Sequence, residues 1–119
     1  MAEHDRLATE ELSRWWKEAG GWQLRQLLFW RWDPIGVSFA FPSTHDEYDG
    51  YAGPVARRLN EGAGVEEIAA FLQEAEEETM GLTSGPGADR RRRNTAELIV
   101  DWYRRSIEFW RPLNAGSQR

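Results

Sequence analysis

The sequence contains no cysteine, and this excludes disulfide bonds, cysteine-ligated zinc sites and thiol chemistry together. Histidine occurs only twice, as His4 and His45, so we expect no zinc site and no other metal centre. No apolar run approaches the roughly 20 residues that cross a membrane, and we expect no membrane partner. The N-terminal segment is acidic where a secretory signal would be basic and then apolar. We therefore expect an intracellular, cytoplasmic protein.

The charge of the chain is unevenly distributed. Its 119 residues suit one domain, and we expect a single helical domain over residues 1–119 with frayed termini at about 1–6 and 113–119. The net charge is −5, yet residues 61–88 carry seven acidic side chains and no basic one, whereas residues 89–119 carry eight arginines and four acidic side chains. We expect the acidic and basic segments to pack side by side and neutralise each other.

Apolar residues at helical spacing predict two helices near the N-terminus. The first, over residues 7–19, has one apolar stripe at i, i+3, i+4 and i+7, made of Leu12, Trp15, Trp16 and Ala19. Thr9 is the expected N-cap, and Gly20-Gly21 is expected to end this helix, because glycine is common just past a helix C-terminus. The second helix, over residues 22–32, is apolar on nearly all sides, so we expect it at the centre of the core.

Three further helices are predicted. Pro54 suits the first position of a short helix over residues 54–60, with Val55 and Leu59 facing inward. Residues 65–80 combine one apolar stripe (Val65, Ile68, Ala69, Leu72 and Ala75) with glutamates expected to face solvent (Glu66, Glu67, Glu74, Glu76, Glu77 and Glu78). The last helix begins at about Ala88 or at Asn94 and ends at Trp110, before Pro112. The expected fold is all-α: a compact single-domain bundle of about five helices.

One long irregular loop, over residues 33–50, interrupts these helices. Ile35, Val37, Phe39 and Phe41 alternate with small residues at a period of two, which is typical of a strand. Because no second strand is evident, an extended segment lying across the helices is the better interpretation. A connection of this length is uncommon in a compact domain unless it has a function.

The loop also concentrates groups that could perform chemistry. Asp46, Glu47 and Asp49, with His45 and Asp33, could supply oxygen and nitrogen ligands to a cation. Their spacing does not fit an EF-hand loop, and we favour turn and helix capping as their role. No serine lies in a strand-turn-helix elbow. We therefore expect no catalytic residue and no enzyme.

Two further compositional features bear on partners. Arg90–Arg93 is the single basic run. Around a helix its members point in different directions and the chain is acidic, so we do not expect nucleic-acid binding; some of these arginines should pair with glutamates between residues 66 and 78. The seven tryptophans must mostly lie in the core. We expect one or two to be partly exposed, because tryptophan is enriched at binding hot spots.

Three short motifs occur in order along the chain: Trp32-Asp33-Pro34-Ile35-Gly36-Val37, Asp46-Glu47-Tyr48-Asp49-Gly50-Tyr51 and Met80-Gly81-Leu82. Over about residues 24–82 they resemble a family of small, uncharacterised bacterial helical proteins, the Bacillus YugE-like domain of unknown function. The resemblance implies a small all-helical fold with the motif loop folded onto it, and it implies no catalytic residues. The N-terminal Trp-Trp helix and the arginine-led C-terminal helix depart from the family pattern.

The expected function is that of a non-enzymatic protein-binding protein. By analogy with small acidic bacterial immunity proteins, its partner would be a basic toxin, because an acidic surface speeds association with a basic one. The expected contacts are Asp46, Glu47, Tyr48, Asp49 and Tyr51 on the loop, with Glu74, Glu77 and Glu78 as a second patch. Two alternatives stay open: a metal-dependent or other enzyme centred on residues 45–49, and a homodimeric structural protein associating through its final helix. No cofactor is expected.

Within residues 46–49 we predict a division of roles. Asp46 and Asp49 should cap turns and the following helix, so that alanine at either position would cost about 0.5–2 kcal/mol of stability. Glu47 should contact the partner. Tyr48 should pack against the protein with its hydroxyl group at the surface.

Overall fold

A computed structural model describes residues 7–83 and 85–117, and within those residues the chain is helical and forms no β-strand. This confirms the all-α prediction. The elements are α2 (Thr9–Trp15), η1 (Trp16–Gly20), α3 (Gly21–Leu27), η2 (Leu28–Trp32), η3 (Ser38–Ala40), α4 (Asp49–Asn60), α5 (Val65–Glu74), η4 (Ala75–Thr79) and α6 (Ala88–Ser117). Because η1, η2 and η4 are π-helical turns that continue their neighbours without a break, the described residues form four long helices and not five.

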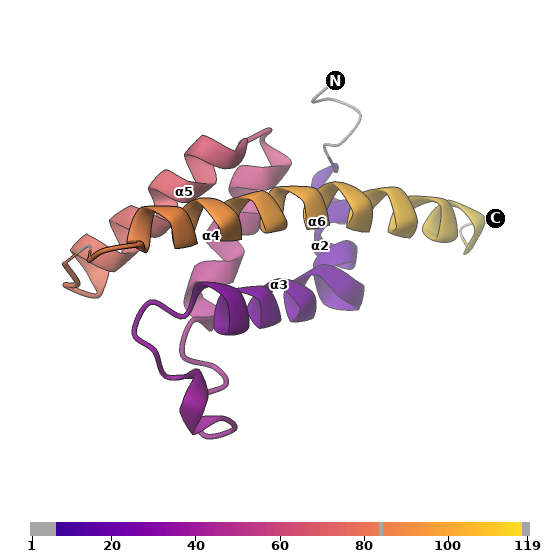
Figure 1. The fold of residues 1–119 in the computed structure, drawn as a ribbon. Helices are drawn as coiled ribbons and strands as arrows, with labels where there is room; N and C mark the ends of the chain where they lie inside the picture. The colour runs from indigo at the N-terminus through magenta and orange to yellow at the C-terminus, as the bar shows by residue number, and fades with distance from the viewer. Residues whose placement is uncertain (1–6, 84, 118–119) are drawn as a thin grey trace.

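The glycine pair expected to end the first helix lies inside it. Gly20 and Gly21 both have right-handed helical backbone angles, so one helix runs from Thr9 to Trp32, and Figure 1 shows it changing direction between α2 and α3. The glycines are needed for close packing: a Cβ atom on Gly20 would lie 2.4 Å from the ring of Trp15. The predicted cap at Thr9 is also wrong, because Ala8 is the N-cap.

The four helices pack around α6, which crosses the length of the molecule (Figure 1). In that view α3 lies on one side of α6 and α5 on the other, while α4 crosses behind α6 from the α3 side to the α5 side. The core between them contains Trp15, Leu24, Leu28, Trp32, Tyr48, Val55, Ile68, Leu72 and Ile99, all at most 1% exposed. None of the helices in the described residues is long and apolar enough to span a membrane.

Helix α4 begins five residues earlier than predicted, at Asp49, and so includes Pro54. A proline at that position removes only the one backbone hydrogen bond that would reach Gly50, in the first turn. Tyr48 is the N-cap, and the helix start has no side-chain cap. The prediction that aspartate side chains cap this helix is therefore wrong. The inward positions of Val55 and Leu59 are confirmed, because both are buried.

The acidic and basic segments pack together as predicted. Arg93 forms an ion pair with Glu66, and the Nη1 atom of Arg92 donates to Glu76 Oε1 at 2.7 Å. Glu76, expected to face solvent, is only 3% exposed, and its Oε2 atom accepts a hydrogen bond from Trp32 Nε1 at 2.7 Å. Glu76 is buried because two donors satisfy its carboxylate, which an amphipathic pattern cannot reveal.

Helix α6 is longer than predicted at its C-terminal end. It begins at Ala88, one of the two starts left open, and continues through Pro112 to Ser117. Pro112 is exposed, so the carbonyl group that loses a backbone donor can face water, and the helix continues. Residues 113–117 thus belong to α6, beyond the predicted end at Trp110, while residues 1–6, 118 and 119 lie outside the described part of the chain.

Candidate functional site

The loop between η2 and α4 is organised by the carboxylate of Asp33. Asp33 Oδ1 accepts hydrogen bonds from the Tyr48 hydroxyl at 2.7 Å and from the Val37 N–H at 2.9 Å, and Oδ2 accepts one from the Ser38 N–H at 3.1 Å. The Tyr48 oxygen in turn accepts the Ile35 N–H at 3.1 Å. Residues 38–40 form a 3₁₀ turn, so the predicted extended segment across the helices is wrong. The motif residues hold the loop in place.

The pKa values of this pair fix their protonation at neutral pH. Burial acts to raise the pKa of Asp33, but hydrogen bonds from Ser38, Tyr48 and Val37 outweigh it and hold that pKa below its ordinary 3.8. Burial, followed by the hydrogen bond to Asp33, raises the pKa of Tyr48 well above its ordinary 10. Asp33 is therefore charged and Tyr48 protonated across the neutral range, each in the form that the hydrogen bond requires.

Tyr48→Phe should lower the free energy of unfolding by about 1–3 kcal/mol, because it removes a donor to a carboxylate.

The folded state lowers the pKa of Asp33. The contribution of Asp33 to the free energy of unfolding is therefore present above the unfolded pKa and is lost as the pH falls through the folded pKa. We expect the difference between wild type and Asp33→Asn to shrink as the pH drops below about 4. Urea unfolding across the acid range measures both effects.

Tyr51→Phe is the matched control for Tyr48→Phe. The Tyr51 ring packs edge-on against Trp32, with ring centroids 5.4 Å apart, and no hydrogen bond involves its hydroxyl among the described residues. The free energy of unfolding of Tyr51→Phe should differ from that of the wild type by no more than about 0.5 kcal/mol. Equal losses for the two phenylalanine variants would show that the Asp33–Tyr48 bond does not organise the loop.

The two predicted contact patches lie on different parts of the molecule. Tyr48 is 1% exposed and its hydroxyl is bonded inside the protein, so the prediction of a surface hydroxyl is wrong and Tyr48 cannot contact a partner. Tyr51 and Asp49 are half-buried, whereas the remaining predicted contacts are exposed: Asp46, Glu47, Glu74, Glu77 and Glu78. Figure 1 shows the loop extending below the helices, while α5 and η4 lie in the upper and left part of the view.

Candidate metal ligands are likewise dispersed. His45 Nδ1 lies 2.9 Å from the carbonyl oxygen of Pro42, within the loop itself. In residues 7–83 and 85–117, no group of three or more histidine, aspartate or glutamate side chains is arranged to hold a metal ion.

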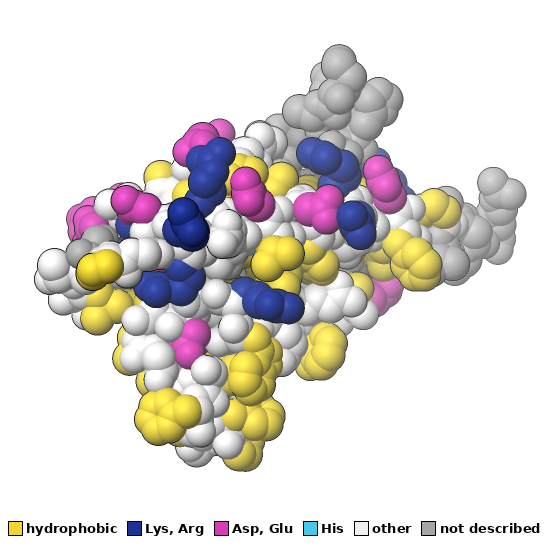
Figure 2. All heavy atoms as spheres, in the orientation of Figure 1, with side chains coloured by type: hydrophobic (Ala, Val, Ile, Leu, Met, Phe, Trp, Pro, Cys, Tyr) yellow, Lys and Arg dark blue, Asp and Glu magenta, His cyan; other side chains and the backbone are white. Residues whose placement is uncertain are grey.

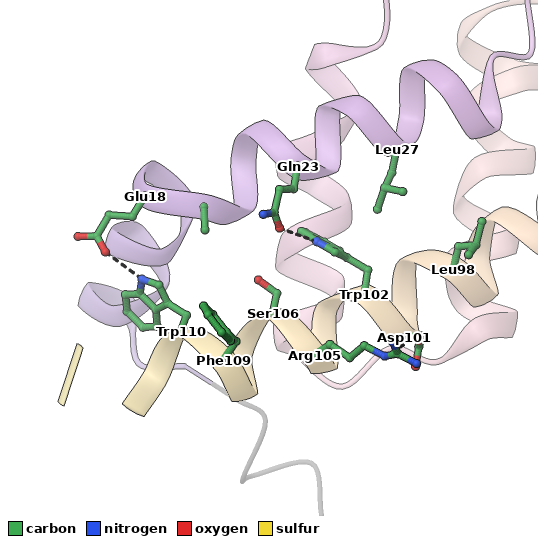
Figure 3. Close-up of a pocket in the computed structure, with 11 residues that line it drawn as sticks. Glu18, Gln23, Leu27, Leu98, Asp101, Trp102, Arg105, Ser106, Phe109 and Trp110 are labelled. Carbon is green, nitrogen blue, oxygen red and sulfur yellow. Dashed lines mark hydrogen bonds and ion pairs between the residues drawn. The ribbon is translucent and has the colours of Figure 1, made fainter. Parts of the chain in front are cut away.

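A groove between the N-terminal helix and α6 is a prominent concave feature of the described residues. One hollow of about 960 Å³ is lined by Glu18, Ala19, Gln23, Leu27, Leu98, Asp101, Trp102, Arg105, Ser106, Phe109 and Trp110. A second, of about 800 Å³, is lined by Trp22, Gln23, Gln26, Leu27, Trp30, Arg31 and Trp102. The two hollows share Gln23, Leu27 and Trp102, so they adjoin, and together we call them the α3–α6 groove. Figure 3 shows the residues of the first hollow: Gln23, Leu27, Trp102 and Ser106 lie in the space between the two helices, whereas Asp101 and Arg105 lie along α6.

Large apolar side chains border this groove while remaining in contact with solvent. Trp22 is 66% exposed, Trp30 49% and Phe109 75%. Trp30 also lies 5.3 Å from the ring of Phe41, which is on the loop, so the apolar surface continues from the groove toward the loop. Figure 2 shows hydrophobic side chains reaching the surface along α6 and in the part of the molecule below it.

Hydrogen bonds hold the groove open in one conformation. Trp102 Nε1 donates to Gln23 at 2.8 Å, and Trp110 Nε1 donates to Glu18 at 2.9 Å (Figure 3). Because each bond joins the N-terminal helix to α6, the two walls are fixed relative to each other. A preformed groove binds with a smaller loss of conformational entropy than one that must be ordered by its ligand.

A third hollow, of about 440 Å³, extends the groove toward the N-terminus of α6. It is lined by Arg31, Gly87, Arg90, Arg91, Asn94, Thr95 and Leu98; it shares Leu98 with the first hollow and Arg31 with the second. The arginine run is thus divided: Arg93 pairs with Glu66 of α5 and Arg92 with Glu76 of η4, as predicted for some of the run. The other two arginines face this hollow.

Sequence reasoning missed the groove although one signal pointed to it. The segment 22–32 is apolar on nearly all sides, which predicted a central helix, but Trp22 and Trp30 face solvent. An apolar side left uncovered is typical of a binding surface. More tryptophans reach solvent than the one or two predicted, because Trp16 and Trp102 are half-buried in addition to the exposed Trp22 and Trp30. No protein family, curated protein or solved structure matches this chain.

Proposed function

We propose that this chain is a non-enzymatic protein-binding protein whose binding surface is the α3–α6 groove. The observation that carries the proposal is the exposure of Trp22, Trp30 and Phe109 around a preformed apolar depression. Contiguous apolar patches on a protein surface mark interaction sites, and tryptophan is among the residues most often found at the energetic centre of interfaces.

A narrower form of the proposal is an immunity-type role against a basic toxin. The exposed carboxylates of Asp46, Glu47, Glu74 and Glu78 support it. They lie outside the lining of the groove, but acidic surface groups attract a basic partner over a distance and accelerate its association. A homodimer is the second candidate, and it is favoured by the exposure of Leu98 (45%) and Phe109 on α6.

The double variant Trp22→Ser/Phe109→Ser tests the binding surface. Because both side chains are largely exposed, the melting temperature should stay close to that of the wild type, with a stability change of about 0.5 kcal/mol or less per site. Affinity for a protein captured from the native host should fall by at least about 1 kcal/mol. Affinity is measured by calorimetry with the purified partner.

Two control variants separate this surface from the acidic one. Glu67→Ser changes an exposed residue of α5 and should bind as the wild type does. Glu47→Ala removes an acidic loop contact. If Glu47→Ala loses the partner while the double variant keeps it, the loop and not the groove is the binding surface, and recovery of no partner by the wild type would contradict both.

A further inference from the structure

The α3–α6 groove and its arginine-lined extension together form one elongated surface. The three hollows share lining residues and follow α6 from Trp110 back to Gly87, the residue before its start. At 1.5 Å per residue this distance is about 35 Å, close to the length of a helix of about 20 residues. Two helices that lie side by side, as α3 and α6 do in Figures 1 and 3, offer the kind of surface on which a third helix packs.

The two ends of this elongated surface differ in charge. At the Trp110 end the lining has two carboxylates, Glu18 and Asp101, and one arginine, Arg105, which pairs with Asp101 at 3.0 Å. At the other end Arg31, Arg90 and Arg91 line a hollow without any carboxylate. No ion pair involves these three arginines within the described residues, in contrast to Arg92 and Arg93.

This gathering of cations is unfavourable in the free protein. Arg90 and Arg91 lie in the first turns of α6, where the positive end of the helix dipole repels cations. Arg31 is brought beside them because its backbone carbonyl accepts a hydrogen bond from Thr95 at 3.1 Å. Carboxylates of a bound partner would offset this repulsion, and guanidinium groups bind carboxylates with two parallel hydrogen bonds.

From the apolar groove and its cationic end, we propose that the partner inserts an amphipathic helix, with its apolar face between α3 and α6 and its acidic end against Arg31, Arg90 and Arg91. This inference rests on the proposed function and adds the chemistry of the partner. Helices bound in grooves present apolar side chains at i, i+3, i+4 and i+7. Such an apolar face would pack against Leu98, Phe109 and the two exposed tryptophans that border the groove. Acidic groups at one end would set the direction of binding.

Three synthetic helical peptides of about 20 residues test the proposal. They share leucines on one face and differ at one end, which carries glutamates, glutamines or lysines. Fluorescence anisotropy with the full chain should show the glutamate peptide binding about tenfold more tightly than the lysine peptide, since exposed ion pairs are individually weak but add here. Arg31→Gln/Arg91→Gln should abolish this preference and keep the leucine-dependent binding, whereas Trp22→Ser/Phe109→Ser should weaken all three peptides.

Several outcomes would overturn the inference. The inference fails if the glutamate peptide does not bind, if all three peptides bind equally, or if the arginine variant still prefers the glutamate peptide to the lysine peptide. Binding to vesicles of phosphatidylcholine and phosphatidylglycerol without peptide binding would assign the surface to lipid, and a wild-type dimer that Phe109→Ser dissociates would assign it to a second copy. If capture of the native partner depends on Trp22 and Phe109 but not on the arginines, the proposed function holds and this inference fails. If capture depends on neither, the proposed function itself fails.

Discussion

Replacing Arg92 with methionine should lower the free energy of unfolding by about 3–5 kcal/mol, the typical cost of removing one partner of a buried ion pair. Arg92 is 2% exposed and Glu76 is 3% exposed, and their charged groups meet at 2.7 Å. Without the guanidinium group, the buried Glu76 carboxylate would lose its cationic partner and would keep the hydrogen bond from the neutral indole of Trp32. Urea unfolding at neutral pH, with linear extrapolation to water, measures the loss.

Two further variants identify the cause of that loss. Arg91→Met changes an exposed neighbour and should alter stability by no more than about 0.5 kcal/mol. Arg92→Met combined with Glu76→Gln should recover part of the stability, because a neutral amide can still accept the hydrogen bond from Trp32. A loss in Arg92→Met no larger than in Arg91→Met would contradict the prediction, as would simple additivity in the double variant.

Gly20→Ala should destabilise the protein by about 3 kcal/mol, at the upper end of the cost of overpacking a core. The new Cβ atom would lie 2.4 Å from the ring of Trp15, which is 0% exposed and donates its Nε1–H to Ser106 on α6 at 2.8 Å. The ring cannot move aside without breaking that bond and displacing α6. The shift of the urea midpoint measures the effect.

Gly50→Ala is the matched control, because Gly50 also lies inside a helix. A Cβ atom there would meet nothing within 4 Å, and alanine reduces the conformational entropy of the unfolded chain. We expect Gly50→Ala to leave stability unchanged or to raise it by about 0.5 kcal/mol. A loss in Gly50→Ala equal to that in Gly20→Ala would show that close approach to Trp15 is not the reason for glycine at position 20.

Local pattern in the sequence was sufficient for the fold class and for much of the core. Ile68, Leu72 and Ala75 recur at helical spacing and are buried, because burying one face of an amphipathic helix depends only on residues a few positions apart. The irregular loop before α4 and the pairing of the acidic segment with the arginine run were also predictable, since turn-forming residues and opposite charges act wherever the chain folds.

The tertiary structure alone decided features that depend on residues distant in the sequence. Gly20-Gly21 has the local properties of a helix end, but the packing of Trp15 makes it the interior of a helix. Glu76 belongs to the polar side of its helix by pattern, yet Arg92, sixteen positions away, and Trp32 bury it. The α3–α6 groove likewise exists only because α3 and α6 pack side by side and leave Trp22 and Phe109 uncovered. Helical periodicity determines which faces are apolar, and only the packing of all the helices determines which of those faces remain open to a partner.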